Sequence, residues 1–541
     1  MQKEELFFLK IPSCDYIHIL ESIKRELKTG NNSLREVSHS EYYESRAEIP
    51  PMKLGVAISH PADRLALAYE QSRKANVVQH SFEQFYRENI RANLYSKLLK
   101  DINISELGYI GLDKYPVRNQ LLCEKWLKSR FKRLTYNKFN NIVLPQISKN
   151  DLENISKIFE EDIFFYEQIV REYERRWGEL CKTNKLSIPE QKSVIIHLGP
   201  PKTGTSSIQY FLNNQKAALT KARVFYPSHN TDSNNVSSGN FTHLITRDKN
   251  DEFYFDDDKA RKLLKKFIAS NAKTLLLSSE HFYYYLPWLF MYFADAKYVF
   301  YIRHPLSMLE SGYHQGIKRH KRTEPFMLPS PANMKFQQLD MFLNIALEFK
   351  SELVYGYFDK SLFKNGSLIE DFMNLIDINL PIEYDNKLVN NQYCYEASEF
   401  MRQCNSFASD WVLGKLDRYL QFYSSNRPAF TFIHTSERSK LNRIIEKNSK
   451  GLIDKAKGLD LDKITSLTNN YVDDIFMDAR YKPNFIDLLS NLKKHEPLLA
   501  SSLRKELKHS ELIDKQKYME CLNLSIIEKI KFELNRFKNK E

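Results

Sequence analysis

The stretch VIIHLGPPKTGTSSI at residues 194–208 decides the fold of the chain around it. Its apolar run ends at a glycine and two prolines, and a lysine then stands among glycine and hydroxyl residues. Beyond the loop, Ile208, Phe211 and Leu212 recur at helical spacing, and serines precede them as they do at many helix starts. The pattern predicts a strand, a tight loop and the N-terminus of a helix.

This loop has the chemistry of an anion site. The N–H groups at a helix N-terminus lack partners, and the helix dipole adds about half a positive charge there. Lys202 supplies a full charge beside them. A Walker loop places its lysine after the last glycine, whereas Lys202 precedes Gly204. The order favours a bound phosphate or sulfate in a loop that departs from the Walker pattern; a plain structural turn is the alternative.

A second stretch, YVFYIRHPLSMLESGY at residues 298–313, repeats the change from strand to helix. Arg303 ends the predicted strand, and its planar guanidinium can donate two parallel hydrogen bonds to phosphate oxygens. Ser311 follows eight positions later and shares a helix face with Ser307. The pair predicts a second phosphate anchor, with a surface ion pair and a solvated serine as the alternatives.

Together the two motifs resemble those of sulfotransferases that use 3′-phosphoadenosine 5′-phosphosulfate (PAPS), in particular bacterial and carbohydrate sulfotransferases. The resemblance covers residues 194–405. It implies that Lys202 lies at the phosphosulfate and that Arg303 and Ser311 hold the 3′-phosphate. It also implies a cradle for the 5′-phosphate, made by Pro201, Thr203, Gly204, Thr205, Ser206 and Ser207.

The resemblance implies an enzyme that transfers a sulfuryl group from PAPS to a hydroxyl or amine, releases adenosine 3′,5′-bisphosphate and uses no metal. A saccharide is the expected acceptor. Glu280 is the first candidate for the general base, because it follows a predicted buried strand and partial burial can bring a carboxyl pKa towards neutrality. His281 and His243 are further candidates. A structural role is the alternative for each of the three.

Two other functions stay open. A nucleotide-dependent kinase or phosphotransferase would use a similar loop, but the chain lacks the Walker lysine-serine end and a strand that ends in a magnesium-binding aspartate. A non-catalytic anion-binding scaffold would share the charges. Ligand stabilisation separates the three functions. A sulfotransferase is expected to be stabilised by adenosine 3′,5′-bisphosphate without magnesium, a kinase by ATP with magnesium, and a scaffold by neither.

Composition and charge limit what the whole chain can be. It has 541 residues, 42% hydrophobic and 27% charged, which predicts a soluble protein of two or more domains. No apolar run nears the ~20 residues of a membrane span, and the first residues do not read as a secretory signal. Six scattered cysteines indicate a reducing compartment, so a cytoplasmic protein is expected. The net charge of +12 and the lack of nucleic acid-binding motifs favour a polyanionic cofactor or acidic glycan over nucleic acid.

The second half of the chain alternates strand and helix patterns, which predicts an α/β fold with a parallel sheet flanked by helices. Ligands bind beyond the carboxyl ends of such strands, where Lys202 and Arg303 fall. Residues 230–247 and 323–335 are expected to be loops over that edge, and the basic run 318–322 is either a ligand contact or a solvated helix end. The predicted strands cover residues 194–198, 224–227, 273–279, 298–302 and 352–357.

We expect three parts: a helix-rich α/β domain at residues 1–186, a catalytic domain at 187–500 and a lysine-rich helical tail at 501–541. Long helical patterns in the first part cover residues 82–99 and 152–177. The tail carries an apolar stripe, which either packs on the body or contacts a membrane surface as a peripheral helix.

The first part resembles a degenerate sulfotransferase domain. Residues 6–16 and 56–69 are similar to the two motifs, with Ser13 in the lysine position and Ser59 in the arginine position. The loss of both anchors implies that this part does not bind PAPS and instead packs against the catalytic part or holds the acceptor. The hypothesis requires that its two motif strands be parallel neighbours and that both serines face one cleft.

Overall fold

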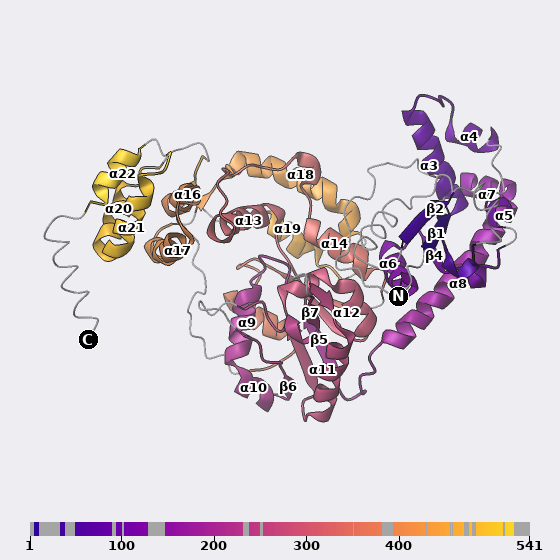
Figure 1. Ribbon diagram of the computed structural model, residues 1–541, viewed down its shortest axis with the longest axis horizontal. Coiled ribbons are helices and arrows are strands. Elements are labelled where there is room, and N and C mark those ends of the chain that lie inside the picture. Colours follow the sequence, from indigo (N-terminus) through magenta and orange to yellow (C-terminus); the bar gives the residue numbers. More distant parts are fainter. Residues whose placement is uncertain are drawn as a thin grey trace.

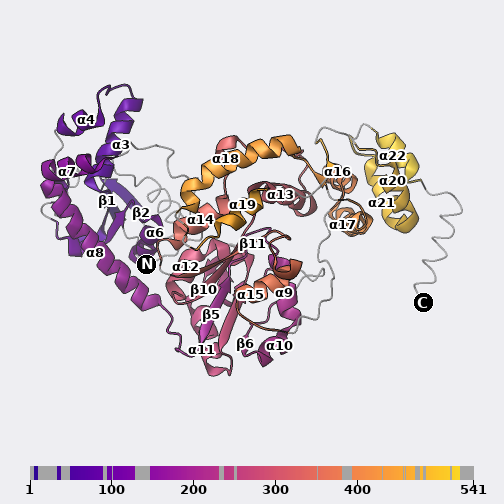
Figure 2. The same cartoon turned by 180° about the vertical axis from the view of Figure 1, so that it is seen from behind.

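The computed structural model contains two parallel sheets flanked by helices, followed by a helical C-terminal part (Figure 1). The α/β class predicted from the sequence is therefore confirmed. Figures 1 and 2 place the second sheet between the first sheet and the C-terminal helices. The structure describes residues 5–9, 33–37, 49–88, 94–99, 102–127, 147–230, 237–248, 253–349, 351–380, 393–428, 430–454, 456, 458–469, 475–478, 483–511 and 514–523.

The second sheet has five parallel strands in the order β11-β10-β5-β9-β6. They are β5 (Ser193–His197), β6 (Val224–Phe225), β9 (Thr274–Ser278), β10 (Lys297–Ile302) and β11 (Glu352–Tyr357). All five strands predicted for this half are therefore confirmed. His197 of β5 lies opposite both Val299 of β10 and Ser278 of β9, so the carboxyl ends of these strands meet at one edge.

Helices cover both faces of this sheet, which is why its strands are apolar along their length. These helices are α9 (Thr205–Asn214), α10 (Lys216–Lys221), α11 (Asp257–Ala269), α12 (Leu286–Tyr292), α13 (Pro305–Arg319), α14 (Gln337–Ala346) and α15 (Leu368–Leu375). On one face, Ile195 shares a core cluster with Ile208 of α9 and Phe372 of α15. On the other face, Phe300 stacks on Phe342 of α14, with ring centres 4.4 Å apart.

The first sheet has four parallel strands in the order β2-β1-β3-β4. They are β1 (Glu5–Leu9), β2 (Ser33–Val37), β3 (Leu54–Ile58) and β4 (Tyr109–Leu112). Phe8 of β1 lies opposite Gly55 of β3, so the predicted pairing of the two motif strands is confirmed. Ser13 lies outside the described residues. The helices of this part are α3 (Pro61–Lys74), α4 (Phe82–Glu88), α5 (Leu94–Leu99), α6 (Pro116–Leu127), α7 (Lys149–Ile158) and α8 (Glu160–Asn184).

The corner after β3 has the same local structure as the corner after β10. In each, a histidine precedes the first proline of a helix and caps it. The Nδ1 atom of His60 accepts from the Ala62 N–H at 3.2 Å, and that of His304 accepts from the Leu306 N–H at 3.3 Å. At the arginine position, buried Ser59 donates to the Asp113 carboxylate. The first sheet thus carries a hydroxyl and a carboxylate where the second carries a guanidinium.

Two local predictions need correction. The helical pattern over residues 152–177 divides into α7 and α8 at Phe159, whose fully buried ring belongs to a small core cluster and whose φ of −115° is not helical. The pattern over residues 82–99 contains the helices α4 and α5, and residues 89–93 between them lie outside the described residues. The predicted loop at residues 230–247 ends in strand β7 (Ile245–Arg247), which pairs antiparallel with β8 (Phe253–Phe255).

The first part packs against the second through α6 and α8. The Trp288 indole donates to the Glu124 carboxylate at 3.2 Å. The Glu348 carboxylate accepts from the backbone N–H groups of Val117 and Arg118, at 3.3 and 3.1 Å, at the start of α6. Burial raises the pKa of Glu348 to about 7. Packing, one of the two roles predicted for the first part, is therefore observed.

The C-terminal part is mostly helical. The predicted boundary at residues 500/501 falls inside α21, which packs on α17 and α20. Residues 524–541, with the predicted apolar stripe, lie outside the described residues. Among the helices in the described ranges, none is long and apolar enough to cross a membrane. The elements are α16 (Tyr395–Cys404), α17 (Asp410–Ser424), β12 (Phe430–Thr431), α18 (Thr435–Ile453), α19 (Leu461–Asn469), β13 (Ile475–Phe476), α20 (Ile486–His495), α21 (Pro497–Leu507) and α22 (Lys515–Cys521).

Candidate active site

The loop between β5 and α9 is held in a tight, closely packed turn. Gly204 precedes α9 with a φ of +74°, and a Cβ there would lie 2.4 Å from Leu368, so glycine is required. Buried Thr203 donates from Oγ1 to the Pro200 carbonyl at 2.7 Å and fixes the turn from within. No side chain caps α9. The Ser207 N–H donates to the Gly204 carbonyl at 3.0 Å, so the N–H groups of Thr205 and Ser206 are the ones available to an anion.

Arg303 meets this loop because β10 lies beside β5. Its Nη1 donates to the Lys202 carbonyl oxygen, and its guanidinium lies 4.9 Å from the centre of the Phe358 ring. Burial lowers the pKa of Arg303 to about 10, while the nearby carboxylates of Glu310 and Asp359 act to raise it. The two predicted anchors, which are 101 positions apart in the chain, are thus in direct contact.

Positive charge is concentrated around Lys202. Burial, together with the charges of Arg303 and Arg319, lowers the pKa of Lys202 to about 8, while the Glu280 carboxylate opposes the shift. Burial likewise lowers the pKa of Lys318 to about 8; the Asp417 carboxylate opposes this shift, and the Arg319 and Lys202 charges contribute to it. Within the described ranges, neither Lys202 nor Arg303 forms an ion pair with a carboxylate. Since half-buried charge without a counter-charge is costly, an anionic ligand would stabilise this cluster.

One face of α13 continues the cluster. Ser307, Ser311, His314 and Lys318 recur at the three- and four-residue spacing that places them on the same side of a helix. His314 is buried, and its Nδ1 atom is hydrogen-bonded to the Ser398 hydroxyl at 3.2 Å. Burial, together with the charges of Lys318 and Lys202, lowers the pKa of His314 to about 3, so the ring is neutral at pH 7. The structure therefore places Lys318, from the basic run, among the site residues.

Glu280 lies in the same site because β9 flanks β5 on the side away from β10. It is half-buried at the start of a short 3₁₀ helix, Glu280–Tyr284, and it lies near enough to Lys202 to oppose the fall in that lysine's pKa. The other two base candidates point elsewhere. His281 stacks on Phe241 at 4.3 Å between ring centres, and His243 Nε2 lies 2.8 Å from the Ser228 carbonyl.

A buried network holds the end of β9 and with it Glu280. The Ser278 N–H donates to Asn240 Oδ1 at 2.9 Å, and the Ser278 hydroxyl lies 2.8 Å from His197 Nδ1. The Ser279 hydroxyl donates to the Ser238 carbonyl at 2.5 Å. No sequence pattern identifies Asn240 or His197 as part of the site. Their positions in a loop and a strand give no chemical signal without the tertiary fold.

The fold and the site define an α/β protein with a cluster of cationic side chains at the carboxyl edge of its second sheet. No known protein family, no characterised protein and no solved structure matches the chain. Its function therefore has to be argued from the residues themselves.

Proposed function

We propose that the protein is a sulfotransferase that moves a sulfuryl group from PAPS to a hydroxyl or amine. The observation that carries the proposal is the contact between Lys202 and Arg303, two half-buried cations without ion pairs in the described ranges, beside the uncapped start of α9. PAPS carries phosphate groups at the 3′ and 5′ positions of one ribose. Two distinct cationic anchors at one sheet edge suit such a ligand.

The chain's own residues divide the work of the reaction. Lys202 and the start of α9 would hold the phosphosulfate end, while Arg303 and Ser311 would hold the 3′-phosphate. When bound, PAPS supplies the sulfuryl group. Glu280 would take the proton of the acceptor hydroxyl, since it is the candidate base that lies beside Lys202. Fixed charges of this kind stabilise charge that develops on the leaving phosphate.

The kinase alternative is less well supported. Thr203 follows the loop lysine, as the magnesium-binding hydroxyl does in a Walker loop, but its buried Oγ1 donates to the Pro200 carbonyl. That hydroxyl is therefore turned into the loop. The scaffold alternative is compatible with the same charges, and a ligand-binding experiment separates the three functions.

Adenosine 3′,5′-bisphosphate is expected to raise the unfolding temperature of the protein without magnesium, because binding to the folded state alone stabilises it. Arg303→Ala is expected to weaken this binding about 10- to 100-fold, since charged hydrogen bonds to a phosphate are lost. Thermal unfolding with the nucleotide, followed by calorimetry, measures both effects.

Arg443→Ala, at an exposed arginine of α18, is the matched control and should bind like the wild type. Stabilisation by ATP only when magnesium is present would support a kinase instead. No stabilisation by either nucleotide would support the scaffold.

The affinity for adenosine 3′,5′-bisphosphate is expected to fall about 10-fold or more between pH 7 and pH 9. The pKa values of Lys202 and Lys318 are about 8, so both are charged below pH 8 and lose their protons above it. A phosphate dianion binds the charged forms, so affinity is greatest below pH 8 and is lost as the pH rises. Calorimetric titrations at three pH values measure this. A Lys202→Arg, Lys318→Arg double variant should show a flatter profile, and a wild-type affinity that is constant up to pH 9 would contradict the proposed ligand contacts.

A further inference from the structure

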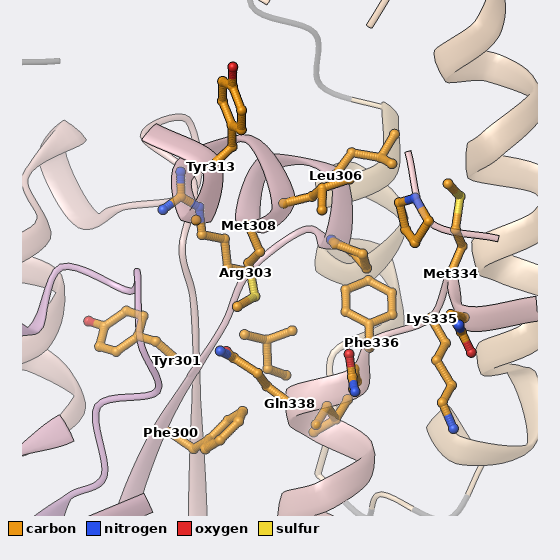
Figure 3. Close-up of a pocket in the computed structure, with 18 of the residues that line it drawn as sticks. Phe300, Tyr301, Arg303, Leu306, Met308, Tyr313, Met334, Lys335, Phe336 and Gln338 are labelled. Atoms are coloured by element: carbon orange, nitrogen blue, oxygen red, sulfur yellow. The ribbon is translucent and has the colours of Figure 1, made fainter. Parts of the chain in front are cut away.

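A cavity of about 350 Å³ lies beyond the end of β10, under the segment that joins α13 to α14 (Figure 3). Its described lining is mainly apolar, and none of the lining residues carries a carboxylate. Arg303, one of the two anchors of the proposed PAPS site, also lines it. The apolar side chains in the wall include Phe300, Leu306, Met308, Leu309, Met334 and Phe336.

The cavity adjoins the loop of the proposed site. Gln338 lines the cavity, and its Nε2 donates to the carbonyl of Pro201 in the anion loop at 3.3 Å. The Tyr283 hydroxyl donates to the Gln338 carbonyl at 2.9 Å, and Tyr283 belongs to the short helix that begins with Glu280. Gln338 therefore stands between the cavity, the loop of Lys202 and the element of the candidate base.

The outer wall of the cavity is anchored to the rest of the protein. Asn448 of α18 donates from Nδ2 to the carbonyls of Pro331 and Met334, at 3.0 and 2.9 Å. The Phe336 N–H donates to the Ser449 hydroxyl at 3.3 Å. Since these bonds hold the segment in place, the cavity is formed before any ligand binds. Preformed apolar cavities bind apolar groups without the cost of ordering a loop.

We propose that this cavity binds the apolar body of the acceptor, which is therefore a phenol or an apolar alcohol rather than the saccharide expected from the resemblance. At ~30 Å³ for each water-sized group, the space suits about a dozen non-hydrogen atoms. The lining also contains polar side chains, but a sugar ring placed against Met308, Met334 and Phe336 would find no hydrogen-bond partner on that wall, which is costly. The polar lining residues include Arg303, Arg322, Asn333, Lys335, Gln337 and Gln338. The hydroxyl of an apolar acceptor can instead lie at the Gln338 end.

The transfer to such an acceptor rests on the proposed function. In that step the acceptor oxygen bonds to sulfur while the bond between sulfur and the 5′-phosphate oxygen breaks. The hydroxyl proton goes to the Glu280 carboxylate, and adenosine 3′,5′-bisphosphate leaves. Binding of the acceptor to the cavity needs none of these events and can be measured alone.

The test uses 2-naphthol as the probe and the full-length protein without nucleotide. Calorimetry is expected to detect its binding to the wild type. Met308→Trp fills the cavity and should weaken that binding at least about 10-fold. Leu309→Phe is a smaller change at the same wall, in case the first variant does not fold. Met327→Trp is the matched control, because Met327 is 70% exposed and lies outside the lining.

With PAPS present, Met308→Trp should also raise the KM for 2-naphthol at least about 10-fold.

The outcomes separate this inference from the proposed function. If the cavity variants lose 2-naphthol binding and the control keeps it, the cavity is supported as a binding site for apolar hydroxyl compounds. This holds even if adenosine 3′,5′-bisphosphate does not bind. No binding of 2-naphthol to a wild type that binds the nucleotide overturns it. The inference is also overturned if the wild type transfers no sulfuryl group to 2-naphthol, while the wild type and Met308→Trp transfer it to N-acetylglucosamine at an equal rate.

Discussion

Replacing Lys202 with alanine is expected to lower kcat/KM for sulfuryl transfer about 100-fold or more, because it removes the charge next to the start of α9. The fold should persist. Lys202 has a φ of +72°, and alanine tolerates that conformation no worse than lysine, so the substitution adds no backbone strain. Initial rates at subsaturating PAPS, with far-UV circular dichroism and the unfolding temperature, measure both outcomes.

Lys221→Ala is the control for the loss of a lysine, because Lys221 is exposed at the end of α10, the next helix along the chain. It should keep wild-type kinetics. If Lys202→Ala kept wild-type turnover at subsaturating PAPS, the assignment of this loop to the phosphosulfate would be wrong. The proposal of a sulfotransferase would then lose its main support.

Much of the second sheet could be predicted because its signals are local. An apolar run that stops at a proline indicates a strand end, and the charged residue near it predicts the kind of ligand to expect. Both motifs follow this rule, at Lys202 and at Arg303, and parallel pairing of β5 and β10 brings them into contact. Glu280 could be placed at the same edge for the same reason, because β9 also pairs with β5.

Other parts of the site could not be predicted because they depend on contacts between distant segments. The sequence leaves Lys318 open between a ligand contact and a solvated helix end, and His314 is an ordinary helix residue. Their place in the site follows only when α13 is placed over the loop, where burial and the charge of Lys202 lower the pKa of both. The cavity likewise depends on Asn448, which holds a segment more than a hundred positions earlier in the chain. The break at Phe159 follows from burial of its ring, which no spacing pattern reveals.

The two sheets suggest why only one is expected to bind PAPS. The corners after β3 and β10 share a histidine cap and a proline, and the two histidines have similar backbone conformations. Their charges differ, because Ser59 pairs with Asp113 where Arg303 stands in the second sheet. A carboxylate at that position repels a phosphate. That the first sheet lacks a PAPS site stays a prediction, since Ser13 lies outside the described residues.

Glu280→Gln is expected to lower kcat about 100- to 10,000-fold, while the affinity for adenosine 3′,5′-bisphosphate changes little. Glutamine has nearly the same shape but cannot accept the acceptor's proton. Because the Glu280 carboxylate supports the charge of Lys202, its loss should also shift the decline of nucleotide affinity to a lower pH. Single-turnover rates and calorimetric titrations over pH 6–9 measure the two effects separately.

The histidines provide the decisive comparison for Glu280. His281 is stacked on Phe241 and His243 contacts the Ser228 carbonyl, so His281→Ala and His243→Ala should each keep most of kcat. Glu437→Gln, at an exposed glutamate of α18, controls for the loss of a carboxylate and should behave like the wild type. If either histidine variant alone lost activity while Glu280→Gln kept it, the general base would be that histidine. Full activity in all three site variants would mean that the acceptor's proton leaves without a side-chain base.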